Sequence, residues 1–299
     1  MRGWKPWELP MKTKLRLLPH EIIFGAFLTA TWLRLVFGIG FFAPNALFYL
    51  TLLSISGVLI HWCVRKETNL RWRARLLFYL VAMNLAYAHL KVAVPAMRPR
   101  AADAILQKVD HWLVGTNLSL RMEAIVHPVL TEFLSACYIL FFPYLLFSVI
   151  VYCVGDLDTF RKFTVGLFSI YGLGFLGYTL LPAQGPHLVM ADQFTVPLTG
   201  GWITRWNAEI VRLGSNRVDV FPSLHCAVSS FFLFFDRVHK PWRFKLYLIP
   251  CVGLWISTIY LRYHYFVDLI AGFALSAFSL WLAKNCKSKG VSHEIPAQV

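Results

Sequence analysis

Seven long apolar runs constrain this chain more than any other feature of its sequence. They are Glu21–Phe42, Ala46–Val64, Leu76–Val94, Phe133–Val154, Phe163–Leu181, Lys245–Tyr260 and Tyr265–Ala283. Each is close to the roughly 20 residues that an α-helix needs to cross the hydrocarbon core of a bilayer. An eighth run, Ala227–Phe235, is shorter and gains length if its helix begins at Phe221. The alternation typical of membrane barrels is absent, so we predict an all-α, polytopic membrane bundle of about eight transmembrane helices.

Composition supports this class of protein. The chain has 299 residues, 58% of them hydrophobic and 15% charged, whereas a soluble domain is nearer one quarter charged. The net charge of +14 lies mainly in the segments between the runs. By the positive-inside rule these basic loops and both termini are cytoplasmic. The charge is therefore explained by topology, and no nucleic-acid partner is expected.

Two segments outside the apolar runs have a distinct character. Residues 99–131 are polar and amphipathic, which predicts an interfacial helix with Trp112 at the depth of the lipid headgroups. Residues 182–220 form a long loop rich in Gly, Pro and Trp that could cover a site. We divide the chain into a cytoplasmic lead (1–20), a membrane-embedded domain (21–284) and a cytoplasmic tail (285–299).

Three short segments hold the polar groups most suited to chemistry, and the span count places all three at the non-cytoplasmic face. In chain order they supply Lys91 and Arg98, then Ser223 and His225, and then Arg262, His264 and Asp268. Lys91, Arg98 and Arg262 can neutralise phosphoryl oxygens, for which the guanidinium fork is well suited. Such a set predicts a phosphate site.

The two histidines suggest how that site would react. His264 and Asp268 are four residues apart, which we interpret as neighbours on one helix face. Asp268 would then hold one imidazole nitrogen and leave the other free to attack phosphorus. The second histidine would protonate the departing oxygen, so the reaction would pass through a phosphohistidine.

The sequences of these segments resemble the three signature motifs of the type 2 phosphatidic acid phosphatase (PAP2) superfamily, and the resemblance covers roughly residues 75–283. The resemblance implies a membrane enzyme that acts on lipid phosphates without a metal or other cofactor. It implies that His264 is the nucleophile, that Asp268 orients it and that His225 is the acid. It also assigns phosphate binding to Lys91, Arg98, Ser223 and Arg262, and places the active site on a periplasmic, extracellular or luminal face.

Two departures leave the second half of the reaction open. The chain has Pro-Ser-Leu-His where many phosphatases have Pro-Ser-Gly-His, and its Arg262-to-His264 spacing is short. Phe-Pro-Ser-Leu-His and the sequence around His264 are similar to the branch that holds inositol phosphorylceramide synthases. The enzyme would be a phosphatase if water resolves the phosphohistidine, and a phosphotransferase if an alcohol or polyol acceptor does. A non-enzymatic anion transporter is the remote alternative.

Two further polar residues call for an explanation. Arg34 lies within the first apolar run, where a charge is costly without a partner. It could extend to the interface, pair with an acid on a neighbouring helix or touch a lipid headgroup. His187 follows Gly185-Pro186 in the 182–220 loop, where it could help to bind an acceptor.

Overall fold

The computed structural model describes residues 17–97 and 99–286, and every regular element in these ranges is helical. The helices that carry the apolar runs are α1 (Pro19–Ile39), α2 (Pro44–Arg65), α3 (Asn69–Ala96), α6 (Pro128–Ile139), α7 (Phe141–Cys153), α8 (Leu157–Leu180), α11 (Leu224–His239), α12 (Pro241–Tyr260) and α13 (Phe266–Asn285). The others are α4 (Asp103–Val114), α5 (Leu118–Arg121), η1 (Met122–Ile125), α9 (Pro186–Val189), η2 (Ala191–Gln193) and α10 (Trp202–Gly214). The prediction of an all-α fold is confirmed for the described ranges.

Six helical segments in the described ranges are long and apolar enough to cross a membrane. They are α1, α2, α3, the joined α6 and α7 (Pro128–Cys153), α8 and α13. The other two predicted spans correspond to α11 and α12. α11 has 16 residues and so rises about 24 Å, less than the roughly 30 Å of hydrocarbon. α12 carries Arg243 and Lys245 in its first turns. A total of eight spans therefore stays a prediction.

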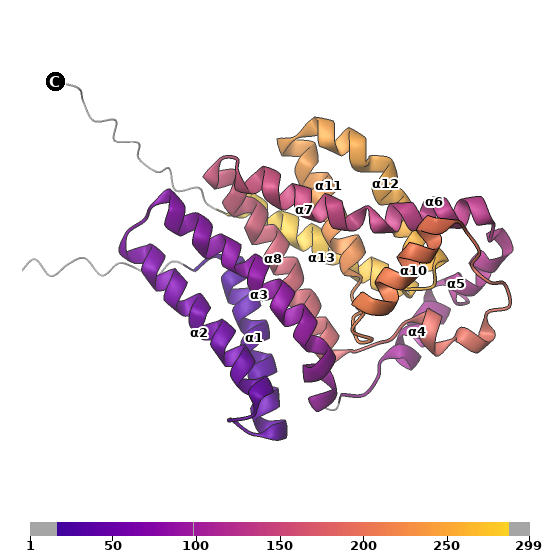
Figure 1. Ribbon diagram of the computed structural model, residues 1–299, viewed down its shortest axis with the longest axis horizontal. Helices are drawn as coiled ribbons and strands as arrows, with labels where there is room; N and C mark the ends of the chain where they lie inside the picture. The colour runs from indigo at the N-terminus through magenta and orange to yellow at the C-terminus, as the bar shows by residue number, and fades with distance from the viewer. Residues whose placement is uncertain (1–16, 98, 287–299) are drawn as a thin grey trace, which may run out of the picture.

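α8 is the central helix of the bundle. In its most apolar stretch 78% of the residues are buried within the protein, against 28% for α1. It packs against α1 and α3 on one side and against α11 and α13 on the other (Figure 1). Arg34 of α1 donates a hydrogen bond to the backbone oxygen of Thr179 in α8, at 2.6 Å. Its partner is thus a carbonyl of a neighbouring helix rather than an acid.

Two glycines let the Phe221–Ser223 segment enter this bundle between α8 and α13. A Cβ atom on Gly177 of α8 would lie 2.6 Å from Pro222 Cδ, and one on Gly272 of α13 would lie 2.6 Å from the Ser223 backbone oxygen. Real Cβ atoms do not approach other atoms so closely. The start of α11, and with it His225, is therefore fixed by close backbone packing on both sides.

A buried ion pair joins α11 to α12. The Arg243 guanidinium lies 3.1 Å from an Asp236 carboxylate oxygen, and both side chains are fully buried. The hydroxyls of Tyr144 and Tyr152 donate to the same carboxylate, at 2.9 Å and 2.5 Å. These contacts connect α7, α11 and α12 at one place.

We expect Asp236→Ala to lower the free energy of unfolding by about 3–5 kcal/mol, because it leaves a buried guanidinium without its counter-charge. The matched control is Glu209→Ala, which removes an exposed ion pair. The Arg212 side chain is 64% exposed and the Glu209 side chain is 50% exposed. Exposed pairs contribute about 1 kcal/mol or less. The midpoints of denaturant-induced unfolding in detergent measure both effects, and equal shifts would contradict the structural role assigned to Asp236.

Candidate active site

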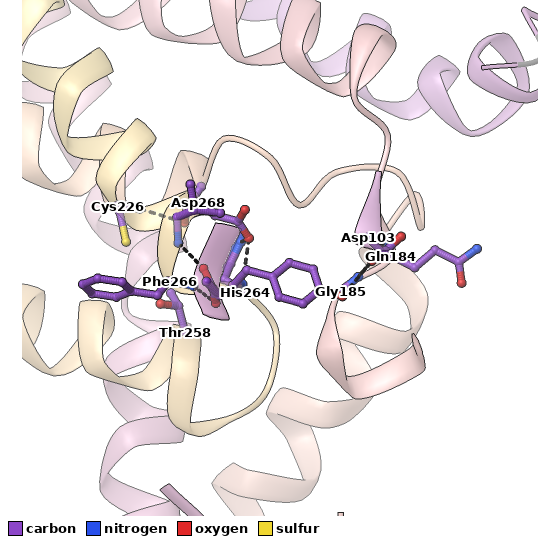
Figure 2. Close-up of polar contacts among 12 residues, drawn as sticks. Asp103, Gln184, Gly185, Cys226, Thr258, His264, Phe266 and Asp268 are labelled. Atoms are coloured by element: carbon purple, nitrogen blue, oxygen red, sulfur yellow. Dashed lines mark hydrogen bonds and ion pairs between the residues drawn. The ribbon is translucent and has the colours of Figure 1, made fainter. Parts of the chain in front are cut away.

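His264 and Asp268 meet at the start of α13. His264 lies in the short connection from α12, where its backbone N–H donates to the Thr258 oxygen at 3.0 Å. The Asp268 carboxylate accepts a hydrogen bond from the Tyr265 N–H at 2.8 Å and lies 3.3 Å from His264 Nδ1 (Figure 2). With Asp268 as acceptor, Nδ1 carries the proton and Nε2 keeps its lone pair.

The contact between these two residues was expected, but its geometry was not. We interpreted their spacing as two neighbours on one helix face, and that interpretation is wrong because α13 begins at Phe266. His264 precedes α13. Asp268, in the first turn of α13, accepts a hydrogen bond from the backbone of Tyr265 and so caps the N-terminus of the helix. The imidazole is consequently held by a helix cap, in which the fully buried Asp268 side chain has little freedom to move.

Two carboxylates of α4 fix the backbone around His264. Asp110 accepts hydrogen bonds from the N–H groups of Phe266 and Val267, both at 2.8 Å. Asp103 accepts from the Tyr265 hydroxyl at 3.0 Å and from the Gly185 N–H at 2.9 Å, and Figure 2 shows it beside Gly185. α4 thereby joins the Gly185 loop to the start of α13.

The sequence interpretation missed Asp103 and Asp110. The signal was present, because two aspartates seven residues apart on a predicted helix share a face with Leu106. That face of α4 is buried, whereas Trp112 is 83% exposed. The amphipathic character expected of residues 99–131 is thus found in α4, and its place at a membrane interface stays a prediction.

His225 lies opposite His264, in the first turn of α11. Their ring centroids are 6.0 Å apart. The His225 ring packs against Tyr138 and Phe141, each at 4.6 Å between centroids. Its Nε2 is buried and has no hydrogen-bond partner among the described residues, which leaves this nitrogen available to a substrate oxygen.

His187 is a third histidine at the same place. Its backbone N–H donates to the Arg262 oxygen at 2.8 Å, and its ring meets Tyr263 edge-on at 5.4 Å. Burial, and then the charge of His264, lower the pKa of His187 to about 4. His187 is therefore neutral at physiological pH, so its ring can donate or accept a hydrogen bond without adding a charge to the site.

The three histidines are among the residues that line a cavity of about 310 Å³. Its walls come from α3, the α6–α7 segment, α8 and α10, and are mostly aromatic and aliphatic. Among the described residues that line it there is no lysine or arginine. The carboxylate of Asp219, also in the lining, accepts a hydrogen bond from the Tyr87 hydroxyl at 2.5 Å. The cavity thus combines three imidazoles and a carboxylate with a largely apolar lining.

The family model of the PAP2 superfamily matches residues 104–282. The chain belongs to the PAP2 superfamily. No curated protein and no solved structure matches it. Membership of this superfamily indicates a phosphatase or phosphotransferase type of activity. The matched range contains His187, His225, His264 and Asp268, and it begins after Lys91 and Arg98.

The other residues expected to bind phosphate in this PAP2 protein include Ser223 and Lys91, neither of which lines the cavity. Ser223 is fully buried as the N-cap of α11, where its hydroxyl accepts from the Cys226 N–H at 3.4 Å. Lys91 is exposed on α3, four residues after the cavity residue Tyr87. Arg98 lies outside the described residues. The roles of these three residues stay predictions.

Arg262 is held beside the site by other groups. Its guanidinium lies 3.1 Å from a Glu123 carboxylate oxygen, donates to the Val196 oxygen and stacks 4.0 Å from the centre of the Phe194 ring. The Val196 N–H, above all, and Arg262 hold the pKa of Glu123 below its ordinary value, so this pair stays charged at neutral pH. For Arg262 to bind phosphate as predicted, its guanidinium must either break these contacts or contact the phosphate while it keeps them.

Gly185 is the position where the His187 loop most requires glycine. Its φ is +89°, and a Cβ atom there would lie 2.6 Å from the Tyr263 oxygen. We expect Gly185→Ala to lower turnover by about 100-fold, because displacement of a site by about 1 Å has effects of that size. The matched control is Gly40→Ala, where φ is +102° but nothing lies within 4 Å. Equal losses of turnover in the two variants would contradict the role given to Gly185.

Proposed function

We propose that this protein is an integral-membrane enzyme that removes or transfers the phosphate group of a lipid through a phosphohistidine on His264. The observation that carries the proposal is the imidazole of His264, whose Nδ1 lies 3.3 Å from an Asp268 carboxylate oxygen and whose ring centroid lies 6.0 Å from that of His225. A nucleophile, its orienting carboxylate and a second proton carrier are what such a transfer requires.

The first half-reaction follows from these positions. His264 Nε2 attacks phosphorus in line with the departing oxygen; the N–P bond forms as the P–O bond breaks. His225 gives its proton to that oxygen and becomes neutral. The negative charge of a bound phosphate favours the protonated form of His225 that this step needs. Asp268 stabilises the positive charge that develops on the His264 ring.

The second half-reaction releases the phosphoryl group. The oxygen of water or of an alcohol attacks phosphorus, His225 takes the proton, and the N–P bond breaks to restore His264. Water yields inorganic phosphate, whereas an alcohol yields a new phosphate ester. Both outcomes use the same residues, so the identity of the acceptor decides between phosphatase and phosphotransferase.

A lipid phosphate suits the surroundings of the histidines. The cavity that they line is otherwise largely apolar, and three of the helical segments around it, α3, α6–α7 and α8, are long and apolar enough to cross a membrane. An acyl or prenyl chain gains free energy there through the burial of its apolar surface. We further propose that the site faces the non-cytoplasmic side, as the distribution of basic loops predicts.

A transferase similar to inositol phosphorylceramide synthases is the second candidate. The observation that favours it is a group of tyrosines in the cavity lining, Tyr138, Tyr171 and Tyr178. Their hydroxyls make no hydrogen bond within residues 17–97 and 99–286. Unpaired hydroxyls are suited to recognising the several hydroxyls of a polyol acceptor.

Purified protein in vesicles decides between the two. It would be offered phosphatidate, a polyprenyl diphosphate or a phosphoinositide, each with and without an alcohol acceptor, with His264→Ala as the control. The phosphatase hypothesis predicts that inorganic phosphate is released without any alcohol acceptor. Product that appears only when acceptor is present would overturn that reading in favour of transfer, and turnover by the control would overturn both.

A further inference from the structure

α10 carries an exposed apolar stripe. Trp202, Trp206 and Leu213 are 65%, 52% and 67% exposed. At 100° per residue these three positions lie within an arc of about 40° on the helix. Trp202 and Trp206 also stack, with ring centroids 6.2 Å apart. Two adjacent tryptophans and a leucine on one exposed face are costly in water and are typical of helices that lie in a membrane interface.

The charged residues of α10 lie on another side. By the same helical periodicity Arg205 and Arg212 lie about 60° and 80° from Trp202 on the side away from the protein, and Glu209 lies between them and the stripe. Glu209 and Arg212 form an exposed ion pair. The face that packs on the protein includes the buried residues Thr204 and Asn207. α10 therefore has a protein face, an apolar face and a charged face, in that order around its axis.

A carboxylate in the first turns of α6 fixes the position of the N-terminus of α10 along α6. Glu132 accepts hydrogen bonds from the N–H groups of Gly201, Ile203 and Thr204 at 2.7, 2.9 and 3.0 Å, and from the Thr204 hydroxyl at 2.7 Å. Glu132 is the fifth residue of the candidate span Pro128–Cys153. The N-terminus of α10 is thus held at the end of a membrane-crossing segment, where an interfacial helix would lie.

The apolar surface of that span continues onto α10. Val129 and Phe133 of α6 are 71% and 50% exposed, as expected for side chains that face lipid. They line a shallow, almost wholly apolar groove that extends to Gly201 and Ile203 at the start of α10. Figure 1 shows α10 lying alongside α6, against which it packs.

We propose that the face of α10 formed by Trp202, Trp206 and Leu213 lies in the headgroup region of the phospholipid leaflet next to the histidine cavity. Ile210, Val211 and Gly214 of the same helix line that cavity. α10 then separates the leaflet from the cavity as a common wall. If the proposed function holds, a lipid phosphate passes from the leaflet to the histidines beside this helix.

Spin labels on α10 test its position without any reference to activity. Single cysteines would replace Trp206 and Leu213, with Arg212→Cys as the matched control, in full-length protein reconstituted into phosphatidylcholine vesicles. The background carries Cys153→Ser and Cys286→Ser, since the other four native cysteines are buried. Labels at 206 and 213 should be relaxed more by oxygen than by a water-soluble nickel chelate, and the label at 212 should show the reverse. An aqueous profile at all three positions would overturn the proposal, and so would labels at 206 and 213 that neither reagent reaches, as expected if a second protein covers this face.

Activity tests the consequence for substrate access. We expect Trp202→Ser combined with Trp206→Ser to lower kcat/KM at least about tenfold for a long-chain lipid phosphate in vesicles, because two large apolar side chains no longer enter the leaflet. A water-soluble short-chain phosphate should react as in the unaltered protein. Equal losses on both substrates would overturn the role in access. An unaltered protein that is inactive on every phosphate would instead reject the proposed function and leave the spin-label result standing.

Discussion

His264→Ala should lower turnover of a lipid phosphate by roughly 10⁴-fold or more, because it removes the proposed nucleophile and with it the covalent route. Asp268→Asn should have a smaller effect, since the imidazole remains but loses the carboxylate that sets its tautomer and stabilises its charge. Phosphate release by purified, folded protein in vesicles measures both variants.

A matched control for that experiment lies on α4. His111 is exposed, and it lies outside the lining of the cavity. His111→Ala should therefore change turnover by less than about twofold, as substitutions away from such sites usually do. A His264→Ala variant that keeps the activity of the control would remove His264 from the role of nucleophile.

His225→Ala should lower turnover of the lipid phosphate by about 10²- to 10⁴-fold, the usual contribution of a general acid. The loss should be much smaller for an aryl phosphate whose leaving group is a weak base, because that oxygen departs without a proton. The two substrates are compared on the same preparation.

The comparison between the substrates separates the chemical role of His225 from a structural one. The His225 ring packs between Tyr138 and Phe141, so its removal also leaves a space in the cavity wall. His225→Gln fills much of that space with a side chain that is a poor proton donor. If both variants lose activity equally on both substrates, His225 is not the acid.

The local parts of this protein could be predicted from its sequence. The apolar runs give the helical class because the bilayer leaves a segment few ways to satisfy its backbone groups. The association of His264 with Asp268 could be predicted because a spacing of four residues brings side chains together both along a helix and across its N-terminal cap.

The parts that depend on distant contacts could not be predicted. Asp110 and Phe266 are 156 residues apart in the chain, and no local pattern connects α4 to the start of α13. The same holds for Arg262, whose partner Glu123 is 139 residues away. Sequence patterns favoured a role in phosphate binding for this arginine, whereas the fold surrounds it with a carboxylate, a carbonyl and an aromatic ring.

The site also shows why the cavity matters to the chemistry. His225 and His264 are brought together by helices whose remaining faces form the core of the bundle, and aromatic groups surround the space between them. Apolar surroundings of this kind strengthen the electrostatic interaction between the Asp268 carboxylate and the charge that the proposed mechanism develops on His264. In the proposed mechanism the cavity walls would also limit which acceptors reach His264.

The most direct test of the covalent mechanism is to trap the intermediate. Protein in vesicles would be mixed with lipid phosphate that carries radioactive phosphorus, quenched with denaturant within milliseconds and digested. The mechanism predicts a labelled peptide that contains His264, with a bond that acid breaks and base does not, and no label in His264→Ala. Full turnover without any such adduct, or with the label on another residue, would contradict it.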